Sequence, residues 1–188
     1  MTMTSDETFK LILVDVDDNP IGSGDKHDIH VNPGQTHRAF SFFLFNSNGE
    51  LFLQKRAQSK LLWPGYWSNS FCSHPNTGEE LEHAVCRRAD DELGIQLQDP
   101  RFLYRFSYQA QYKNIGYEDE VCSVYFAVSD AEPIANPSEL SEGIYVSIEK
   151  ISEFISTHPD EVTPWFVMEW QHIGHHYMDD IRTAINAG

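Results

Sequence analysis

The sequence predicts an α+β domain in which helices cover a β-sheet. Three observations predict it: several short runs of β-branched and aromatic residues, one well-marked helix near the middle of the chain, and helices toward the C-terminal end. The 188 residues suffice for one domain with a substantial core, and 40% of them are apolar. Because no linker, internal repeat or low-complexity segment is visible, we expect residues 1–188 to form a single domain.

The N-terminal half is predicted to contain strands and turns. A strand is expected over Phe9–Val16, followed by turn and loop structure from residue 17 to residue 36, where Gly and Pro recur. Two further strands are expected at Ala39–Phe45 and Leu51–Gln54. The four residues between them, Asn46-Ser47-Asn48-Gly49, are typical of a hairpin turn.

The clearest helix is expected from Glu79 to Leu93. Thr77 is a candidate N-cap, and the first turn is rich in acidic residues, which the helix dipole favours: Glu79, Glu80 and Glu82. Gly94 follows the last helical residue, as expected of a C-terminal cap. One apolar stripe along this helix is predicted to face the sheet: Leu81, Val85 and Ala89.

The C-terminal half is predicted to add three strands and two helices. The expected elements are strands at Phe102–Tyr108, Val121–Val128 and Ile144–Ile148 and a short helix at Glu149–Ser156. Thr163 and Pro164 then begin the last helix as cap and first residue. Its buried stripe recurs at steps of three and four: Phe166, Trp170, Ile173, Tyr177, Ile181 and Ala184. Trp165 lies off this stripe.

Composition limits the kinds of partner. A net charge of −16 argues against sequence-independent binding to nucleic acid or anionic membranes, although a small anion needs only a few local cations. The polar residues 1–8 do not resemble a signal peptide or an anchor, and no apolar run is long enough for a membrane span. Three cysteines make a poor disulfide framework. We therefore expect a cytoplasmic protein, with Cys86 and Cys122 buried as small apolar residues.

Two short segments place reactive side chains two positions apart. Cys72 and His74 would face one side of an extended segment, and so would Glu118 and Glu120. If the two segments are neighbours, a thiol, an imidazole and two carboxylates converge. With the loop histidines His30 and His37 they form a mixed set of nitrogen and oxygen donors suited to Mn²⁺, Mg²⁺ or Zn²⁺. A solvated loop is the alternative interpretation of each single histidine.

Residues 73–95, which include the central helix, resemble the Nudix box. The positions that match are Glu79, Arg87, Glu92, Gly94 and Ile95. Ser73, Arg88 and Asp91 depart from the motif, and they fall on the acidic cluster that holds metal in Nudix diphosphate hydrolases. The resemblance implies a Nudix-type mixed β-sheet sandwiched between helices, with an N-terminal strand and loop extension. It makes ordinary Nudix hydrolysis doubtful.

From about His27 to about Trp170 the chain resembles one branch of that superfamily, the type 1 isopentenyl-diphosphate Δ-isomerases. The resemblance rests on an ordered series of segments: His30, His37 with residues 39–41, Gln54-Lys55-Arg56-Ala57 with Lys60, residues 63–69, Cys72-Ser73-His74-Pro75, Arg87-Arg88 with Glu92-Leu93-Gly94, residues 118–122, and Thr163-Pro164-Trp165. It implies interconversion of isopentenyl and dimethylallyl diphosphate through a tertiary carbocation, in isoprenoid biosynthesis. Ser73 departs from the Gly that the family has there.

The resemblance also implies roles for single residues. One divalent metal would be bound by His30, His37, His74, Glu118 and Glu120. Cys72 and Glu120 would be the acid–base pair, with Tyr108 beside Glu120 and Trp165 capping the pocket. Mg²⁺ would arrive with the substrate diphosphate and be held by Glu92 and the Cys72 carbonyl. The phosphates would be clamped by Lys26, Arg56, Lys60 and Arg87.

Two other functions stay open from the sequence: a Nudix hydrolase of nucleoside diphosphates and a non-catalytic domain that binds a metal or a prenyl diphosphate. The expected partner is a small prenyl diphosphate, with no nucleic acid and no membrane, and the chain is expected to be a monomer or a homodimer. His172, His175 and His176 recur at helical spacing, and a solvated helix face is the favoured interpretation.

Overall fold

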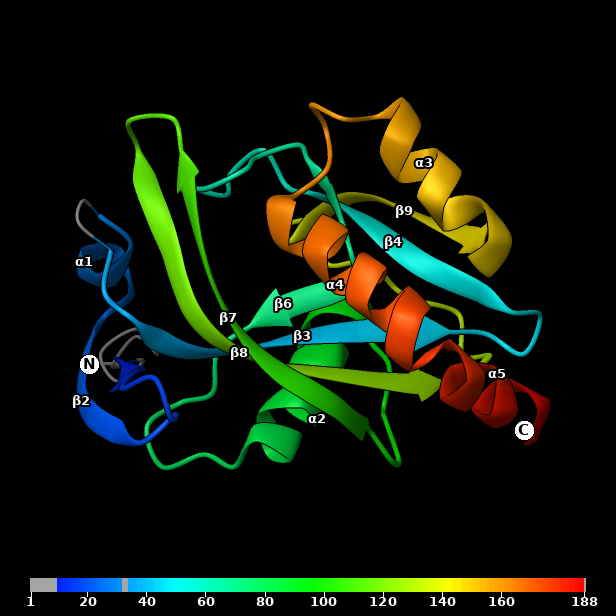
Figure 1. Ribbon diagram of the computed structural model, residues 1–188, viewed down its shortest axis with the longest axis horizontal. Helices are drawn as coiled ribbons and strands as arrows, with labels where there is room; N and C mark the ends of the chain where they lie inside the picture. The colour runs from blue at the N-terminus through cyan, green and yellow to red at the C-terminus, as the bar shows by residue number, and fades with distance from the viewer. Residues whose placement is uncertain (1–9, 32–33, 188) are drawn as a thin grey trace, which may run out of the picture.

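A mixed β-sheet with helices on both faces organises the chain, as the computed structural model shows (Figure 1). It describes residues 10–31 and 34–187. The sheet of these residues has nine strands: β1 Lys10–Val14, β2 Pro20–Asp25, β3 His37–Phe45, β4 Glu50–Arg56, β5 Trp67–Ser68, β6 Phe71–Ser73, β7 Arg101–Tyr112, β8 Gly116–Val128 and β9 Leu140–Ser147. The predicted sheet sandwiched between helices is confirmed.

Strand β3 is the centre of the sheet. It pairs in parallel with β8 along its whole length and antiparallel with β1, β4 and β6. The predicted turn at residues 46–49 is present, with Gly49 at a φ of 75°, but β3 and β4 pair only at Phe45 and Leu51. Beyond that point β4 pairs with β9 and β5 instead. Strands β3 and β4 therefore separate where the predicted hairpin would have continued.

The segment before β3 is more regular than the predicted loop. Pro20–Asp25 forms β2 against β1, and Lys26–His30 forms a short helix, α1. Pairing with β2 supplies hydrogen-bond partners for the backbone N–H and C=O groups of β1, which an irregular loop would not do. Gly24 permits the close packing, because a Cβ there would lie 3.2 Å from the Ile29 Cδ1. The predicted first strand ends at Val14 rather than Val16, and Phe9 lies outside the described residues.

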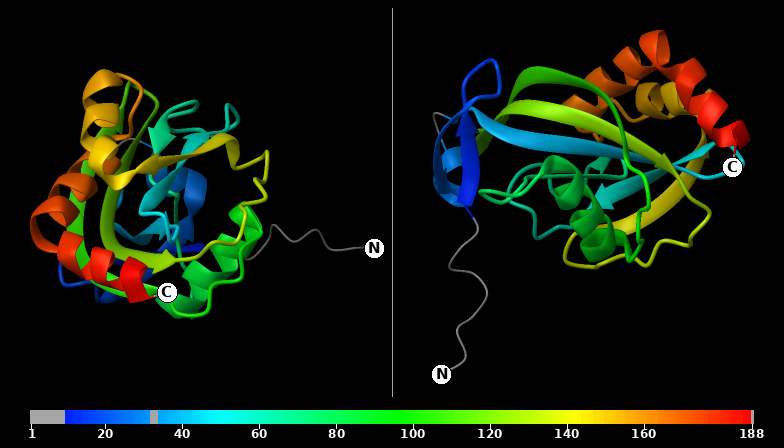
Figure 2. Two further views of the ribbon diagram at one scale, coloured as in Figure 1. Left: turned by 90° about the vertical axis from the view of Figure 1, so that its right-hand side faces the viewer. Right: turned by 90° about the horizontal axis from the view of Figure 1, so that it is seen from below.

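Helix α2, Leu81–Leu93, covers one face of the sheet (Figure 2). The predicted cap Thr77 was wrong: Glu80 is the N-cap residue, and the Thr77 hydroxyl donates to the Lys10 carbonyl. The predicted Gly94 cap is confirmed, with a φ of 63° and its N–H directed at the Asp90 carbonyl. The apolar residues of β3 that face this helix are Phe40, Phe42 and Leu44.

Helices α3 and α4 and the C-terminal helix cover the other face. The turn η1 Ile148–Lys150 leads into α3 Ile151–Thr157, which matches the predicted short helix. The single predicted last helix is two helices, α4 Pro164–His176 and α5 Met178–Ala187, because Tyr177 leaves the helical conformation at a φ of −129°. Its apolar stripe is nevertheless buried as predicted, apart from the half-buried Tyr177. No helix among the described residues is long and apolar enough to cross a membrane.

The strand register brings the polar residues of the site together. Strand β8 begins at Gly116, earlier than the predicted Val121, so Glu118 and Glu120 lie within a strand. Glu120 is directly opposite Tyr108 on β7 and opposite His37 on β3. Three side chains from three neighbouring strands therefore stand in one row across the sheet.

Candidate active site

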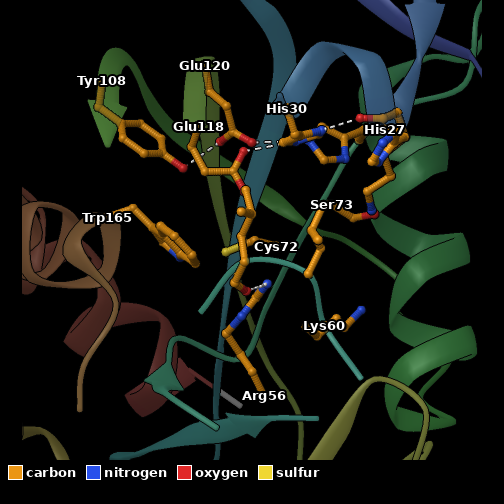
Figure 3. Close-up of a pocket in the computed structure, with 14 residues that line it drawn as sticks. His27, His30, Arg56, Lys60, Cys72, Ser73, Tyr108, Glu118, Glu120 and Trp165 are labelled. Carbon is orange, nitrogen blue, oxygen red and sulfur yellow. Dashed lines mark hydrogen bonds and ion pairs between the residues drawn. The ribbon is translucent and has the colours of Figure 1, made fainter. Parts of the chain in front are cut away.

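The site is a pocket of about 370 Å³ at the end of the sheet, lined by residues of α1 on one side and by Trp165 of α4 on the other (Figure 3). Side chains from distant parts of the chain line it: Lys26, His27, His30, Arg56, Lys60, Leu61, Leu62, Cys72, Ser73, His74, Tyr108, Glu118, Glu120 and Trp165. One wall carries a cluster of imidazoles and carboxylates, another carries cations, and Leu61, Leu62 and Trp165 supply apolar surface.

The predicted metal ligands converge. One ligand atom from each of five buried residues lies within 4.8 Å of the others: His30, His37, His74, Glu118 and Glu120. The shortest approaches are 3.0 Å from His30 Nε2 to Glu118 Oε2 and 3.1 Å from His74 Nε2 to Glu120 Oε1. Register explains the convergence, since β3, β8 and the end of β6 are neighbours in the sheet.

The hydrogen bonds of the imidazoles fit a bound cation. His30 Nδ1 lies 2.6 Å from the Lys26 carbonyl, and His37 Nδ1 lies 2.8 Å from the Gln35 carbonyl. An Nδ1–H donated to a carbonyl leaves a lone pair on Nε2, which is the usual arrangement of a metal-binding histidine. Burial, followed by the neighbouring His37, lowers the pKa of His74 well below its ordinary value. His74 is therefore also a neutral imidazole, which can offer a lone pair to a metal.

Glu120 divides its carboxylate between two tasks. Its Oε1 lies 3.1 Å from His74 Nε2, inside the cluster, whereas its Oε2 accepts a hydrogen bond of 2.8 Å from the Tyr108 hydroxyl. Burial acts to raise the pKa of Glu120, but the neighbouring His37 and the hydrogen bond from Tyr108 keep that pKa below its ordinary value. Burial and the Glu120 charge raise the pKa of Tyr108 well above its ordinary value, so Tyr108 remains a donor.

Cys72 is half-buried in the wall of the same pocket and lies outside the group of five candidate metal ligands. Its Sγ lies 3.0 Å from Asn69 Oδ1 and 3.2 Å from Ser41 Oγ. Burial, followed by the charge of Glu169, raises the pKa of the Cys72 thiol well above its ordinary value. The residue is therefore held as a hydrogen-bonded thiol. Of the other two cysteines, Cys122 is buried as predicted and Cys86 is only half-buried.

Trp165 lies on the first turn of α4 with its ring in the pocket wall. We predicted it to lie off the buried stripe, but it is 3% exposed. Its indole Nε1 donates to Ser68 Oγ at 3.1 Å, and its ring packs edge-on against Trp63 at a centroid distance of 5.1 Å. The burial arises because β5, which the sequence did not predict as a strand, lies beside the start of α4.

Three of the four predicted phosphate-binding cations line the pocket. Arg56 donates to the carbonyls of Leu62 and Trp63 and lies over the Trp165 ring at 5.3 Å. Lys60 forms an ion pair with Glu139, a residue that the sequence did not single out. Lys26 projects from the start of α1 into the same space.

The fourth predicted cation, Arg87, is placed differently. Its guanidinium bonds both carboxylate oxygens of Glu79 at 2.8 Å, and it is not among the lining residues. Its neighbour Arg88 instead lies 3.2 Å from Glu139, the carboxylate that also holds Lys60. In the sequence, Arg88 departs from the Nudix box and is part of the resemblance to the isomerases, but its contact with Glu139 was not predicted.

Glu92, the expected ligand of the Mg²⁺ that arrives with the diphosphate, lies beside Arg88. It is 2% exposed, and its Oε1 accepts the Arg88 guanidinium at 2.5 Å. Burial raises the pKa of Glu92, and the Arg88 charge opposes that rise. Because Arg88 occupies the position of an acidic residue in the Nudix box, Glu92 faces a cation where a hydrolase of that kind has a second carboxylate.

Glu169 on α4 is a buried carboxyl that the sequence did not reveal. It is fully buried and close to Cys122, whose Sγ lies 3.9 Å from its Oε1, while its Oε2 has no partner among the described residues. Burial and the Glu120 charge raise the pKa of Glu169 well above its ordinary value. A carboxyl in this environment destabilises the fold at any pH at which it must ionise.

Glu169→Gln is expected to stabilise the protein at neutral pH. The folded state keeps the Glu169 proton above the ordinary pKa, where the unfolded chain has lost it, so stability falls as pH rises. Urea unfolding should therefore give wild type and variant similar free energies near pH 4.5 and a gap that favours the variant, about 1 kcal/mol or more by pH 8. Glu153→Gln, at an exposed position on α3, is the control. Equal pH dependence in wild type and Glu169→Gln would contradict the assignment.

Helix α4 carries three further histidines that lie outside the site. His172, His175 and His176 are exposed on α4 as predicted, and none of them lines the pocket. The His172 ring packs at a tilt against Tyr104, with a centroid distance of 4.2 Å.

Comparison with known proteins agrees with the geometry of the site. A NUDIX domain matches residues 35–166. The chain is 48% identical to isopentenyl-diphosphate Delta-isomerase 1 of Photorhabdus laumondii subsp. laumondii over 91% of this chain and 98% of that protein. It is 39% identical to the isopentenyl-diphosphate Delta-isomerase of Pectobacterium atrosepticum, over 87% of this chain and 90% of that one.

Solved structures agree on the fold. A crystal structure of a Deinococcus radiodurans protein superposes with a TM-score of 0.70 at 25% identity, over 89% of this chain and 99% of that one. A MutT NUDIX hydrolase from Burkholderia pseudomallei superposes with a TM-score of 0.59 at 22% identity, over 73% and 97%. The fold is shared with hydrolases, whereas the sequence agrees with isomerases along most of its length. The chain therefore belongs to the NUDIX domain family and, within it, to the isopentenyl-diphosphate Δ-isomerases.

Proposed function

We propose that this chain interconverts isopentenyl and dimethylallyl diphosphate in the pocket at the end of the sheet. The observation that carries the proposal is the divided carboxylate of Glu120. One oxygen belongs to the metal cluster, and the other is bonded to Tyr108 in the same pocket that contains the Cys72 thiol. A Nudix hydrolase is not favoured, because Arg88 stands where the motif has an acidic residue and pairs with Glu92.

The residues on the metal-binding wall suit one divalent cation, Mn²⁺, Mg²⁺ or Zn²⁺. Three imidazole nitrogens and two carboxylates would hold it: His30, His37, His74, Glu118 and Glu120. When bound, the ion would neutralise the two carboxylates and fix the orientation of Glu120 toward the substrate. Mg²⁺ would arrive with the diphosphate; the Cys72 carbonyl would hold it together with Glu92, which would first have to leave Arg88.

Binding of a divalent ion is expected to stabilise the fold through these residues. At a Mn²⁺ concentration about 100 times the dissociation constant, the gain in unfolding free energy is about 2.7 kcal/mol. Differential scanning calorimetry of metal-free protein with and without Mn²⁺ measures it. We expect His74→Ala to lose the rise in Tm and His172→Ala, on the exposed face of α4, to keep it. An equal rise in both variants would place the metal elsewhere.

The reaction needs an acid and a base on opposite sides of an unactivated double bond. One group donates a proton to the terminal carbon, which produces a tertiary carbocation, and the other removes a proton from the carbon on the far side of the cation. Glu120 and Cys72 are the proposed pair. Tyr108, whose hydroxyl lies 2.8 Å from Glu120 Oε2, would relay the proton on the Glu120 side.

The carbocation must be stabilised and kept from water. The ring of Trp165 presents an aromatic face in the pocket wall, and such a face attracts a cation. Leu61 and Leu62 complete the apolar part of the lining, which limits the access of water to the reacting carbons.

The diphosphate would anchor the substrate without taking part in the chemistry. Lys26, Arg56 and Lys60 supply positive charge on one wall of a chain whose net charge is −16. Arg87 is a less direct candidate, because it would have to leave Glu79 to reach a phosphate. Binding energy from the diphosphate then holds the remote carbons between the acid and the base.

The activity itself is tested with purified protein, Mg²⁺ and isopentenyl diphosphate. Proton NMR follows the vinylidene signals of the substrate and the methyl signals of dimethylallyl diphosphate, while a colorimetric assay follows phosphate. The proposal predicts an equilibrium mixture of the two isomers with no phosphate release. Phosphate release with no isomer formed would favour the hydrolase instead.

A further inference from the structure

The side chain of Asn69 lies behind the pocket and touches the thiol that the proposed reaction uses. Asn69 is fully buried in the turn between β5 and β6 and is not among the lining residues. Its amide is fully committed. The Nδ2 donates to the carbonyls of Phe42 at 3.1 Å and Phe71 at 3.0 Å, while the Oδ1 accepts from Ser68 Oγ at 2.9 Å and Cys72 Sγ at 3.0 Å.

These contacts determine which way the amide points. If it were turned over, Oδ1 would face two carbonyl oxygens, and both Nδ2 hydrogens would lose their acceptors. The oxygen must therefore face Cys72, and only a thiol hydrogen can complete that contact. The S–H bond of Cys72 is consequently directed at Asn69, and the Ser41 hydroxyl at 3.2 Å is left to donate to the sulfur.

The same oxygen connects Cys72 to the aromatic wall. Ser68 is also fully buried, and its hydroxyl accepts the Trp165 indole N–H at 3.1 Å while donating to Asn69 Oδ1. Thr163 Oγ1, at 2.8 Å, donates the remaining hydrogen bond to Ser68. Every donor in this series of hydrogen bonds has an acceptor. The Trp165 N–H donates to Ser68, and the Ser68 hydroxyl and the Cys72 S–H both donate to Asn69 Oδ1.

We propose that Asn69 is a positioning residue for the isomerisation: its locked amide sets the direction of the Cys72 S–H bond and, through Ser68, ties the Trp165 ring to that thiol. The proposal rests on the proposed isomerase activity for its kinetic consequence. Cys72 and Trp165 come from β6 and α4, so without such a link their mutual placement would depend on packing alone. A small displacement of a reacting group is costly, because proton transfer requires short, aligned contacts.

The test compares Asn69→Ala with Ser70→Ala in the metal-loaded enzyme. Ser70 is a matched control: it is adjacent, fully buried and hydrogen-bonded to the backbone of Leu44 and Phe52, away from the pocket. The direct readout is the infrared S–H stretching band of Cys72, isolated by subtracting the spectrum of the corresponding Cys72→Ala protein. Loss of the Asn69 acceptor should move this band to higher wavenumber, whereas Ser70→Ala should leave it in place.

The kinetic readout separates positioning from general destabilisation. We expect kcat of Asn69→Ala to fall by about 10-fold or more with KM within about threefold of wild type. Ser70→Ala should lower Tm but leave kcat within about twofold. An S–H band that is unchanged in Asn69→Ala, or a kcat loss of the same size in both variants, would overturn the proposal.

Ser68→Ala provides a second measurement if Asn69→Ala does not fold. It keeps Asn69 and removes the competing donor, so the hydrogen bond from the Cys72 S–H to Asn69 should strengthen and the S–H band should move to lower wavenumber. An unmoved band in Ser68→Ala contradicts the shared acceptor. Because the infrared measurement needs no substrate, a chain without isomerase activity would still show these shifts, and failure of the proposed function can be told from failure of this inference.

Discussion

Replacing Glu120 with Gln is expected to lower kcat by about 10²–10⁴-fold, the usual contribution of a positioned acid or base. The amide keeps the size of the side chain and can still face the metal cluster, but it cannot give up or take a proton. The Oε2 that Tyr108 now reaches at 2.8 Å would become a group without acid–base function. Steady-state kinetics with the metal content measured in parallel tests the expectation.

Asp119→Asn is the matched control for this experiment. Asp119 lies between Glu118 and Glu120 but is directed at Gln109, which donates a hydrogen bond to its Oδ2 at 2.9 Å. The same loss of charge at this position should leave kcat within about twofold. If Glu120→Gln retains more than about a tenth of the wild-type kcat with its metal bound, the role assigned to Glu120 is wrong.

Cys72→Ala is expected to have an effect of similar size, about 10²–10⁴-fold in kcat. The thiol is the second proposed proton-transfer group, and Asn69 and Ser41, which now contact its sulfur, would both lose that contact. KM should change little, since the diphosphate is held by cations on another wall. Cys86→Ala is the control, because Cys86 lies on α2 and does not line the pocket. Equal activities of the two variants would remove Cys72 from the mechanism.

The sequence predicted those parts of the fold that depend on local patterns. The central helix, the turn before Glu50 and the Pro164 start of α4 all follow from capping and turn residues. The β2 strand was missed because its glycine-containing sequence carries no period and gains its structure from pairing with β1. Helix α1 was missed because its five residues are too few to show a helical period. The break at Tyr177 was missed because the apolar stripe continues across it.

The candidate site was predictable where spacing alone places side chains together. Cys72 with His74, and Glu118 with Glu120, are each two residues apart, and the extended backbone directs each pair to one side. The contacts that cross between strands were not predictable. Glu169, Asn69 and Arg88 gain their surroundings from register and helix docking, so only the folded chain shows what they touch.

The central claim is that the pocket adds a proton to one carbon of the substrate and removes one from another. The most direct measurement incubates the metal-loaded protein with isopentenyl diphosphate in D₂O and follows deuterium by NMR and mass spectrometry. The account predicts deuterium in the methyl groups of dimethylallyl diphosphate and in recovered isopentenyl diphosphate, with incorporation about 10²–10⁴-fold slower for Glu120→Gln and Cys72→Ala. Binding of isopentenyl diphosphate with no deuterium incorporated, or phosphate release in its place, would contradict it.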